Sequence, residues 1–325
     1  MDEIEQHTAD TDDGYRLVLQ RLNGGDKGPV IMCHGLSGNS YEYLISEDEK
    51  NSLARYLANR GYDAWVVDVR GHGNSKGYFV KEENRWDYSQ KADGYWSFIV
   101  DDLIQHDTPA LINKIKEVTS SSKVSWIGRS MGGWLAYAHA IDGSGSTDFK
   151  GVISVASPSH FSPNIKRIMG SSPYLKKFLN STPIDHLPAP PFQYTGGGNR
   201  PKMLNMMSSE SRYVILDFLD YVSRGEIARH DYGREGNIEY YGSETPPSYW
   251  ERFDKIDVPM IFITGTRDLF ATPENTTESF NKVNESHGNA KLHILSGFGH
   301  INILVGKNAH DKVYPLILNG LDGFE

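Results

Sequence analysis

A chain of 325 residues, 38% of them hydrophobic and 23% charged, can bury a large core, which excludes a disordered or fibrous protein. The formal net charge of -9 gives no electrostatic reason to bind nucleic acid or anionic lipid, and the apolar runs are far shorter than the ~18 residues of a membrane-spanning helix. Cys33 is the single cysteine, so an internal disulfide is excluded, and the acidic N-terminus does not resemble a signal peptide. We therefore expect a cytoplasmic protein.

Short runs of branched residues alternate with helical patterns along the chain. In the first half, the patterns predict strands at 15–22, 29–33, 63–69, 123–127 and 151–157, and helices at 51–61, 96–118 and 131–141. In the last quarter, they predict strands at 258–265 and 289–297, and helices at 272–285 and 307–321. This alternation is typical of an α/β protein with a mainly parallel sheet and helices on both of its faces.

Residues 158–250 break the alternation and are rich in proline, glycine, aromatic residues and methionine. A structureless loop of this length is improbable in a compact domain, so we predict a helical cap inserted after the sixth core strand. The core then consists of 1–157 and 251–325. Within the cap, SRYVILDFLDYVSRG predicts one apolar helical face, formed by Ile215, Phe218, Leu219 and Val222. This face is expected to pack on the core; alternatively, part of it lines an acyl pocket.

The segment GRSMG at 128–132 matches the pattern Gly-x-Ser-x-Gly. The match alone is weak, but here it follows a predicted strand and opens a predicted helix, as a nucleophile elbow does. Glycines on both sides of such a strained turn allow close approach of the chain, and the hydroxyl of Ser130 would stand at the carboxyl edge of the sheet. The alternative is a tight turn with an incidental serine.

A serine nucleophile needs a base, and the base needs an acid that orients it. Asp268 directly follows the predicted strand 258–265, and His300 lies in a glycine-rich loop after the next strand. Both side chains should therefore lie at the same sheet edge as Ser130, in the chain order serine, acid, histidine. His293 lies inside a predicted strand, where a structural role is expected.

Acyl transfer also needs N–H donors that bind the developing oxyanion. The N–H of Met131 follows the nucleophile, and Leu36 in the loop CHGLSGNS is the best second donor. His34 and Cys33 are expected to be structural, the cysteine as a small buried hydrophobic residue. The glycine-rich loop 68–77 lacks the ending of a phosphate-binding loop and should border the site. No His, Asp or Glu group has a convincing metal spacing, so neither a metal nor a cofactor is expected.

Long segments of the chain are similar to one known family. They include CHGL, NSLARYLANRGYDAWVVDVRGHGNS, YWSFIVDDLIQHDTPALI, ITGTRDLFATP and FGHINILVGKNAHDKVY. They resemble the α/β-hydrolase superfamily, and more narrowly the acid lipases, which include gastric, lysosomal and steryl-ester lipases. The resemblance implies an α/β-hydrolase fold, the triad Ser130, Asp268 and His300, and the oxyanion donors Leu36 and Met131. The chain departs from the family at Arg129 and Met131, which replace His and Gln beside the serine, and at Asn302, where an aspartate is common.

The sequence thus predicts a serine hydrolase that cleaves carboxylic esters with hydrophobic acyl groups through an acyl-enzyme intermediate. Its expected partner is a small ester or lipid substrate, without nucleic acid and without stable membrane insertion. An acyltransferase, a thioesterase and a small peptidase share the chemistry at the serine and stay open as alternatives. A binding module that reuses the fold without catalysis is a further alternative. The pattern predicts no particular oligomeric state.

Overall fold

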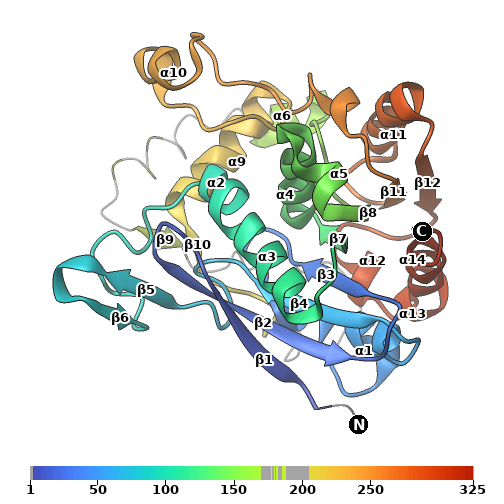
Figure 1. Cartoon of the computed structure of the whole chain (residues 1–325). Helices are drawn as coiled ribbons and strands as arrows, with labels where there is room; N and C mark the ends of the chain where they lie inside the picture. The colour runs from blue at the N-terminus through green and yellow to red at the C-terminus, as the bar shows by residue number, and fades with distance from the viewer. Residues whose placement is uncertain are drawn as a thin grey trace.

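The computed structural model describes residues 3–169, 177, 179, 181, 185–187 and 205–324. Ten of its strands form one sheet. They are β1 (Glu5–Asp10), β2 (Tyr15–Asn23), β3 (Pro29–Cys33), β4 (Asp63–Asp68), β5 (Gly77–Val80), β6 (Arg85–Asp87), β7 (Val124–Arg129), β8 (Phe149–Val155), β11 (Met260–Gly265) and β12 (Ala290–Leu295). Their order is β12-β11-β8-β7-β3-β4-β2-β5-β6, and β1 pairs with β2 outside this path (Figure 1).

The six strands from β12 to β4 in this order are parallel, whereas β2 runs antiparallel to β4 and to β1. The carboxyl ends of β3, β7, β11 and β12 therefore meet at one edge of the sheet. The predicted mainly parallel α/β sheet is confirmed. The sequence pattern does not predict β1 or the hairpin of β5 and β6, since these strands are short or largely solvent-facing and give little apolar alternation.

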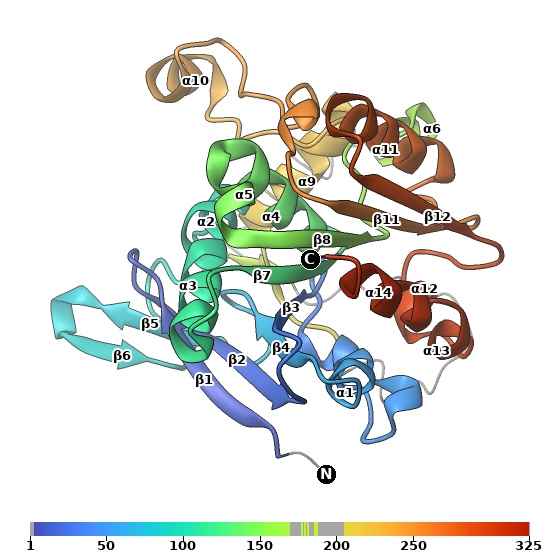
Figure 2. The ribbon, with the colours of Figure 1, turned by 45° about the vertical axis from the view of Figure 1, so that its right-hand side comes forward.

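Helices cover both faces of the sheet (Figure 2). One face carries α1 (Leu53–Ala58), α12 (Asn302–Val305), α13 (Ala309–Lys312) and α14 (Tyr314–Leu321). The other carries α2 (Val100–Asp102), α3 (Thr108–Thr119), α4 (Met131–His139) and α11 (Pro273–His287). The predicted helix at 307–321 is interrupted at Val313, and α14 begins with Pro315 in its first turn, where a missing backbone N–H costs nothing.

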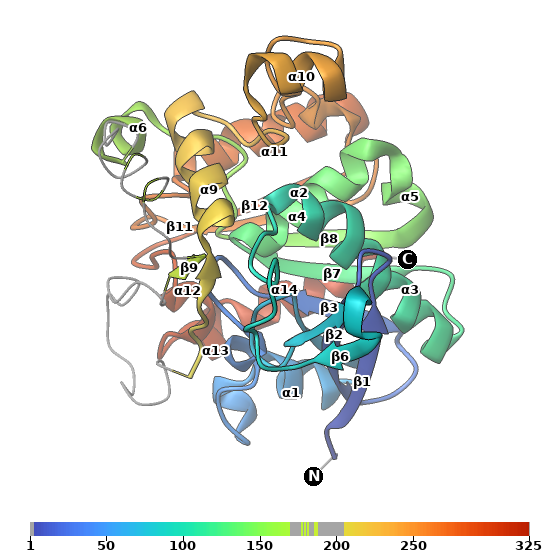
Figure 3. The same cartoon turned by 90° about the vertical axis from the view of Figure 1, so that its left-hand side faces the viewer.

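The described part of the predicted cap contains α6 (Pro163–Met169), β9 (His186–Leu187), β10 (Glu210–Ser211), α9 (Arg212–Arg224) and α10 (Gly233–Tyr241). Strands β9 and β10 pair antiparallel, and α6 and α9 lie side by side while α10 projects from the body (Figure 3). Much of the predicted cap between residues 170 and 204 lies outside the described residues. Among the described residues, no helix is both long and apolar enough to cross a bilayer.

The buried face of α9 differs from the predicted one. Leu219 and Val222 are buried as expected, but Ile215 and Phe218 are only half-buried. Asp217 occupies part of the buried face instead, because its carboxylate accepts the N–H of Val100 and binds the His230 ring. Burial raises the pKa of Asp217, and His230 opposes this shift. A partnered carboxylate can therefore stand where an apolar side chain was expected.

Candidate active site

The turn between β7 and α4 holds Ser130 in a conformation that few side chains adopt. Its backbone angles are φ 51° and ψ -116°, in the strained region with positive φ. The glycines on both sides are required by close packing: a Cβ on Gly128 would stand 2.3 Å from the Gly132 carbonyl oxygen, and one on Gly132 would stand 2.3 Å from that of Cys33. The segment GRSMG is thus the sharp strand–turn–helix that its pattern predicts.

The structure brings the three predicted side chains together at the carboxyl edge of the sheet. Ser130 Oγ lies 3.0 Å from His300 Nε2. On the other side of the imidazole, His300 Nδ1 lies 3.1 Å and 3.0 Å from the two carboxylate oxygens of Asp268. This is the arrangement of a hydroxyl, a base and an orienting acid.

Two loops fix the acid and the base. The buried carboxylate of Asp268 accepts the backbone N–H groups of Phe270 and Ala271, each at 2.9 Å. These two bonds fix the orientation of the carboxylate independently of His300. In the second loop, Asn302 Oδ1 accepts the N–H of Gly299 at 2.6 Å, next to His300. Asn302, which stands where the family commonly has an aspartate, therefore also holds the loop that carries His300.

The predicted oxyanion loop, which we define as residues 34–37, follows β3 and lies against the elbow, because β3 pairs with β7. The imidazole of His34 hydrogen-bonds the Gly35 carbonyl at 2.9 Å and accepts the N–H of Val69 at 3.3 Å. Burial and the neighbouring His72 hold the pKa of His34 well below 6.5, so the ring is neutral. Cys33 is fully buried, and burial raises the pKa of its thiol. Structural roles for both residues are thus confirmed.

Sequence reasoning missed two buried acids at this loop. Glu42 Oε2 accepts from Arg129 Nε at 2.7 Å, and Glu210 Oε2 lies 3.0 Å from His72 Nε2. Glu42 is 2% exposed and Glu210 is fully buried. Burial raises the pKa of Glu42 although Arg129 opposes the shift. The unusual Arg129 beside Ser130 is the sequence signal that could have indicated Glu42, because a buried cation needs an acidic partner.

A chain of aromatic rings leads from the cap to the base. The Phe270 ring centroid is 5.0 Å from that of His300, and Phe218 on α9 is 6.3 Å from Phe270. Phe218 in turn stacks on Trp134 of α4 at 6.1 Å and lies 6.0 Å from Phe161. Since Phe218 and Phe270 are only half-buried, they give the surroundings of His300 an apolar character.

The loop 68–77 is held by buried charged side chains. Asp68 accepts the N–H groups of Ser40 and Asn74, at 2.6 Å and 2.9 Å. Arg70 pairs with Asp107 and Asp13. Asp12, Asp13 and His106 place ligand atoms within 4.8 Å of one another, a grouping that their sequence spacing does not predict. These groups already form ion pairs, Asp13 with Arg70 and Asp12 with His106, so they carry no metal assignment.

Comparison with known proteins decides the family. The sequence model described as the alpha/beta hydrolase fold matches residues 28–307. The chain belongs to this family. A second model, a partial alpha/beta-hydrolase lipase region, matches residues 3–47 of this alpha/beta hydrolase. The predicted fold and superfamily are thereby confirmed.

Curated relatives of this alpha/beta hydrolase carry lipase names. It is 24% identical to the tear acid lipase-like protein of Mesocricetus auratus, over 94% of this chain and 84% of that protein. It is 26% identical to lipase member M of Homo sapiens, over 97% and 82% of the two chains. The gastric triacylglycerol lipase of Rattus norvegicus is 24% identical over 95% and 86%. These names agree with the predicted likeness to acid lipases.

Solved structures show the same fold. A soluble variant of the monoglyceride lipase from Saccharomyces cerevisiae has a TM-score of 0.65 at 15% identity, covering 100% of this alpha/beta hydrolase and 95% of that chain. The thioesterase domain from the curacin biosynthetic pathway has a TM-score of 0.61 at 17% identity, covering 98% and 99%.

Proposed function

We propose that this alpha/beta hydrolase cleaves carboxylic esters with Ser130 as nucleophile, His300 as general base and acid, and Asp268 as the group that orients His300. One observation carries the proposal: Ser130 Oγ lies within hydrogen-bond distance, 3.0 Å, of an imidazole whose other nitrogen binds a buried carboxylate. The lipase names of the curated relatives support the same reaction class.

In the proposed reaction, Ser130 Oγ attacks the ester carbonyl carbon while its proton passes to His300 Nε2. Asp268 stabilises the imidazolium that forms. The N–H groups of Leu36 and Met131 bind the oxyanion of the tetrahedral intermediate, which collapses and releases the alcohol with the proton from His300. Water, deprotonated by His300, then attacks the acyl carbon, and the second tetrahedral intermediate collapses to the acid as His300 returns this proton to Ser130 Oγ.

The surroundings of the base favour an apolar acyl group. Phe270 presents a half-buried ring beside His300, and the half-buried Phe218 ring lies next to Phe270. Burying each methylene of a substrate against such surfaces contributes about 0.8 kcal/mol. We therefore propose esters with hydrophobic acyl chains as substrates.

Hydrolysis of p-nitrophenyl esters of increasing acyl length tests the proposal, with wild type and Ser130→Ala compared. We expect the variant to lose at least ~10³ in kcat/KM, because the nucleophile is removed. Ser125→Ala, which removes another buried serine on β7, is the matched control and should stay active. Equal activity of wild type and Ser130→Ala would contradict the proposal. Formation of an ester of an added alcohol, in place of the free acid, would indicate acyl transfer instead.

A further inference from the structure

The N–H groups on either side of Leu36 both bind buried carboxylates. Gly35 donates its N–H to Glu42 Oε1 at 3.2 Å, and Ser37 donates its N–H to Glu210 Oε2 at 2.8 Å. Ser37 has φ 52°, which is an unusual conformation for a side chain other than glycine. The peptide units before and after the unit that carries the Leu36 N–H are thus each held by a carboxylate, one from the core and one from the cap.

The first carboxylate ties the oxyanion loop to the nucleophile. Glu42 binds Arg129, which directly precedes Ser130, while its other oxygen accepts the N–H of Gly35. The Arg129 guanidinium packs closely on the oxyanion loop: a Cβ on Gly35 would stand only 2.7 Å from Arg129 Nη2. Glu42 therefore sets the distance between the serine turn and the oxyanion loop through one charge-assisted contact on each side.

The second carboxylate ties the oxyanion loop to the cap. Glu210 belongs to β10, and its Oε2 atom is shared between the Ser37 N–H and the imidazole of His72. Burial alone would lower the pKa of His72, but the charge of Glu210 and its hydrogen bond raise this pKa above 6.5. His72 Nδ1 hydrogen-bonds the Arg70 carbonyl at 2.8 Å, which fixes the ring. Each buried carboxylate thus has its own basic partner, Arg129 for Glu42 and His72 for Glu210.

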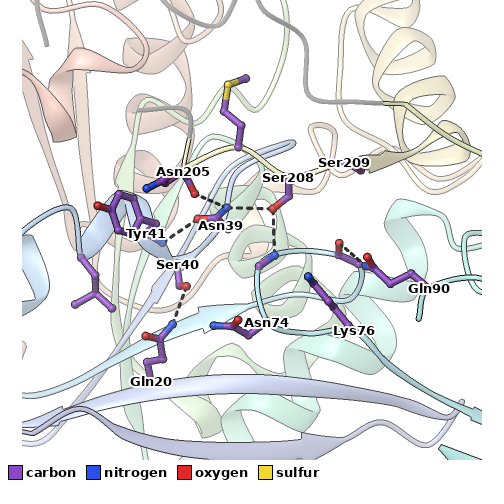
Figure 4. Close-up of a pocket in the computed structure, with 14 residues that line it drawn as sticks. Gln20, Asn39, Ser40, Tyr41, Asn74, Lys76, Gln90, Asn205, Ser208 and Ser209 are labelled. Atoms are coloured by element: carbon purple, nitrogen blue, oxygen red, sulfur yellow. Dashed lines mark hydrogen bonds between the residues drawn. The ribbon is translucent and has the colours of Figure 1, made fainter. Parts of the chain in front are cut away.

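Neighbouring contacts seat the same segment of the cap. Asn39 Nδ2 donates to the Asn205 carbonyl at 2.9 Å and to Ser208 Oγ at 3.1 Å (Figure 4), and Ser208 donates its N–H to the Ser37 carbonyl at 2.9 Å. These groups border a cavity of about 490 Å³. Because its Asn39 and Ser40 side chains already bond to the protein, we interpret the cavity as part of the joint between cap and core.

We propose that Glu42 and Glu210 are positioning residues that hold the Leu36 N–H in the oxyanion hole, and that Glu210 makes this hole depend on a seated cap. The inference rests on the proposed ester hydrolysis. Neither carboxylate touches the reacting atoms. Each acts through the backbone of the oxyanion loop, where a displacement of one ångström can cost about 10²-fold in rate.

A trifluoromethyl ketone with an alkyl chain tests the positioning role directly. Ser130 Oγ adds to its carbonyl carbon, the proton passes to His300, and the hemiketal oxygen occupies the oxyanion hole. In Glu42→Gln and in Glu210→Gln we expect the inhibition constant to rise roughly 10- to 100-fold, in parallel with the loss of kcat/KM. Binding of the methyl ketone with the same chain, which forms no adduct, should not change.

Asp63→Asn is the matched control, since it removes a buried carboxylate paired with Arg21 at the opposite end of β4. It should leave both inhibition constants unchanged. If Glu42→Gln does not fold by circular dichroism, Glu210→Gln and Arg129→Lys carry the test. Folded variants that keep the trifluoromethyl ketone affinity of wild type would overturn the inference. Failure of the hydrolase proposal is distinguishable, because wild type itself would then bind both ketones equally and cleave no ester.

Discussion

Two histidine–carboxylate pairs lie close to the oxyanion loop, and their difference shows what catalysis requires. His300 binds Asp268 at 3.0 Å, and His72 binds Glu210 at the same distance. The His300 side chain is 20% exposed, and its second nitrogen faces the Ser130 hydroxyl. His72 is fully buried, and its second nitrogen hydrogen-bonds a backbone carbonyl. Both pairs join an imidazole to a buried carboxylate, but only His300 has a second nitrogen that faces a side-chain hydroxyl.

Replacing each histidine by glutamine gives the largest contrast. His300→Gln should lower kcat/KM for a p-nitrophenyl ester by roughly 10⁴-fold, because the serine loses its base. His72→Gln should lower it only about 10-fold, because His72 acts through Glu210 and the oxyanion loop. Steady-state kinetics on both purified variants measures the difference. Equal losses of kcat/KM in the two variants would contradict the inference that His300 acts as the base and His72 acts only through the oxyanion loop.

The neighbouring rings of His72 and His34 offer a second contrast, in the pH dependence of stability. Their centroids lie 4.9 Å apart. The pKa of His72 is raised, against the effect of burial, by Glu210 and by Asp68; that of His34 is lowered by burial and by His72. In the folded state His72 therefore keeps its proton to a higher pH than a free imidazole does, and His34 loses its proton at a lower pH.

The contributions of His72 and His34 to the free energy of unfolding change with pH in opposite directions. Stability from charged His72 is fully present below pH 6.5 and is lost as pH rises through the folded-state pKa. The destabilisation by His72→Gln, about 1–3 kcal/mol, should therefore shrink as pH rises above 6.5. The destabilisation by His34→Gln should instead shrink as pH falls below 6.5, since the unfolded chain then binds the proton. Urea unfolding across this range measures both slopes, and parallel slopes would contradict the assignment.

The proximity of Ser130, Asp268 and His300 could be predicted from the sequence, whereas the pair of His72 and Glu210 could not, for a physical reason. Ser130, Asp268 and His300 each follow a strand that the pattern predicts, and parallel strands bring their carboxyl ends to one edge. Glu210 follows no such strand. It lies 173 residues from Ser37, in a segment whose local pattern gives no sign that a carboxylate is buried. Glu42 lies in a short 3₁₀ helix, where an acidic residue is usually solvated.

The cap helix shows the limit of periodicity. The pattern of α9 indicates an apolar face, but a carboxylate with two partners can be buried there at little cost, so Asp217 takes a core position and Phe218 moves to the rim. The shift matters for function, because the rim position brings the Phe218 ring within 6.3 Å of Phe270. Contacts between distant segments, rather than local propensity, decide which residues reach the base.

The aromatic rings of Phe270 and Phe218, which lead from His300 toward the cap, give the smallest and last contrast. Phe218→Ala removes a ring from the apolar surroundings of the base without touching the triad, so the loss should depend on the acyl chain. We expect kcat/KM to fall about 10-fold for long-chain esters, equivalent to roughly 1.4 kcal/mol of lost burial, and little for acetate. Tyr240→Ala, at an exposed cap aromatic on α10, is the matched control. An equal loss for short and long esters would mean that Phe218 only stabilises the cap, since an acyl contact must scale with the length of chain that it covers.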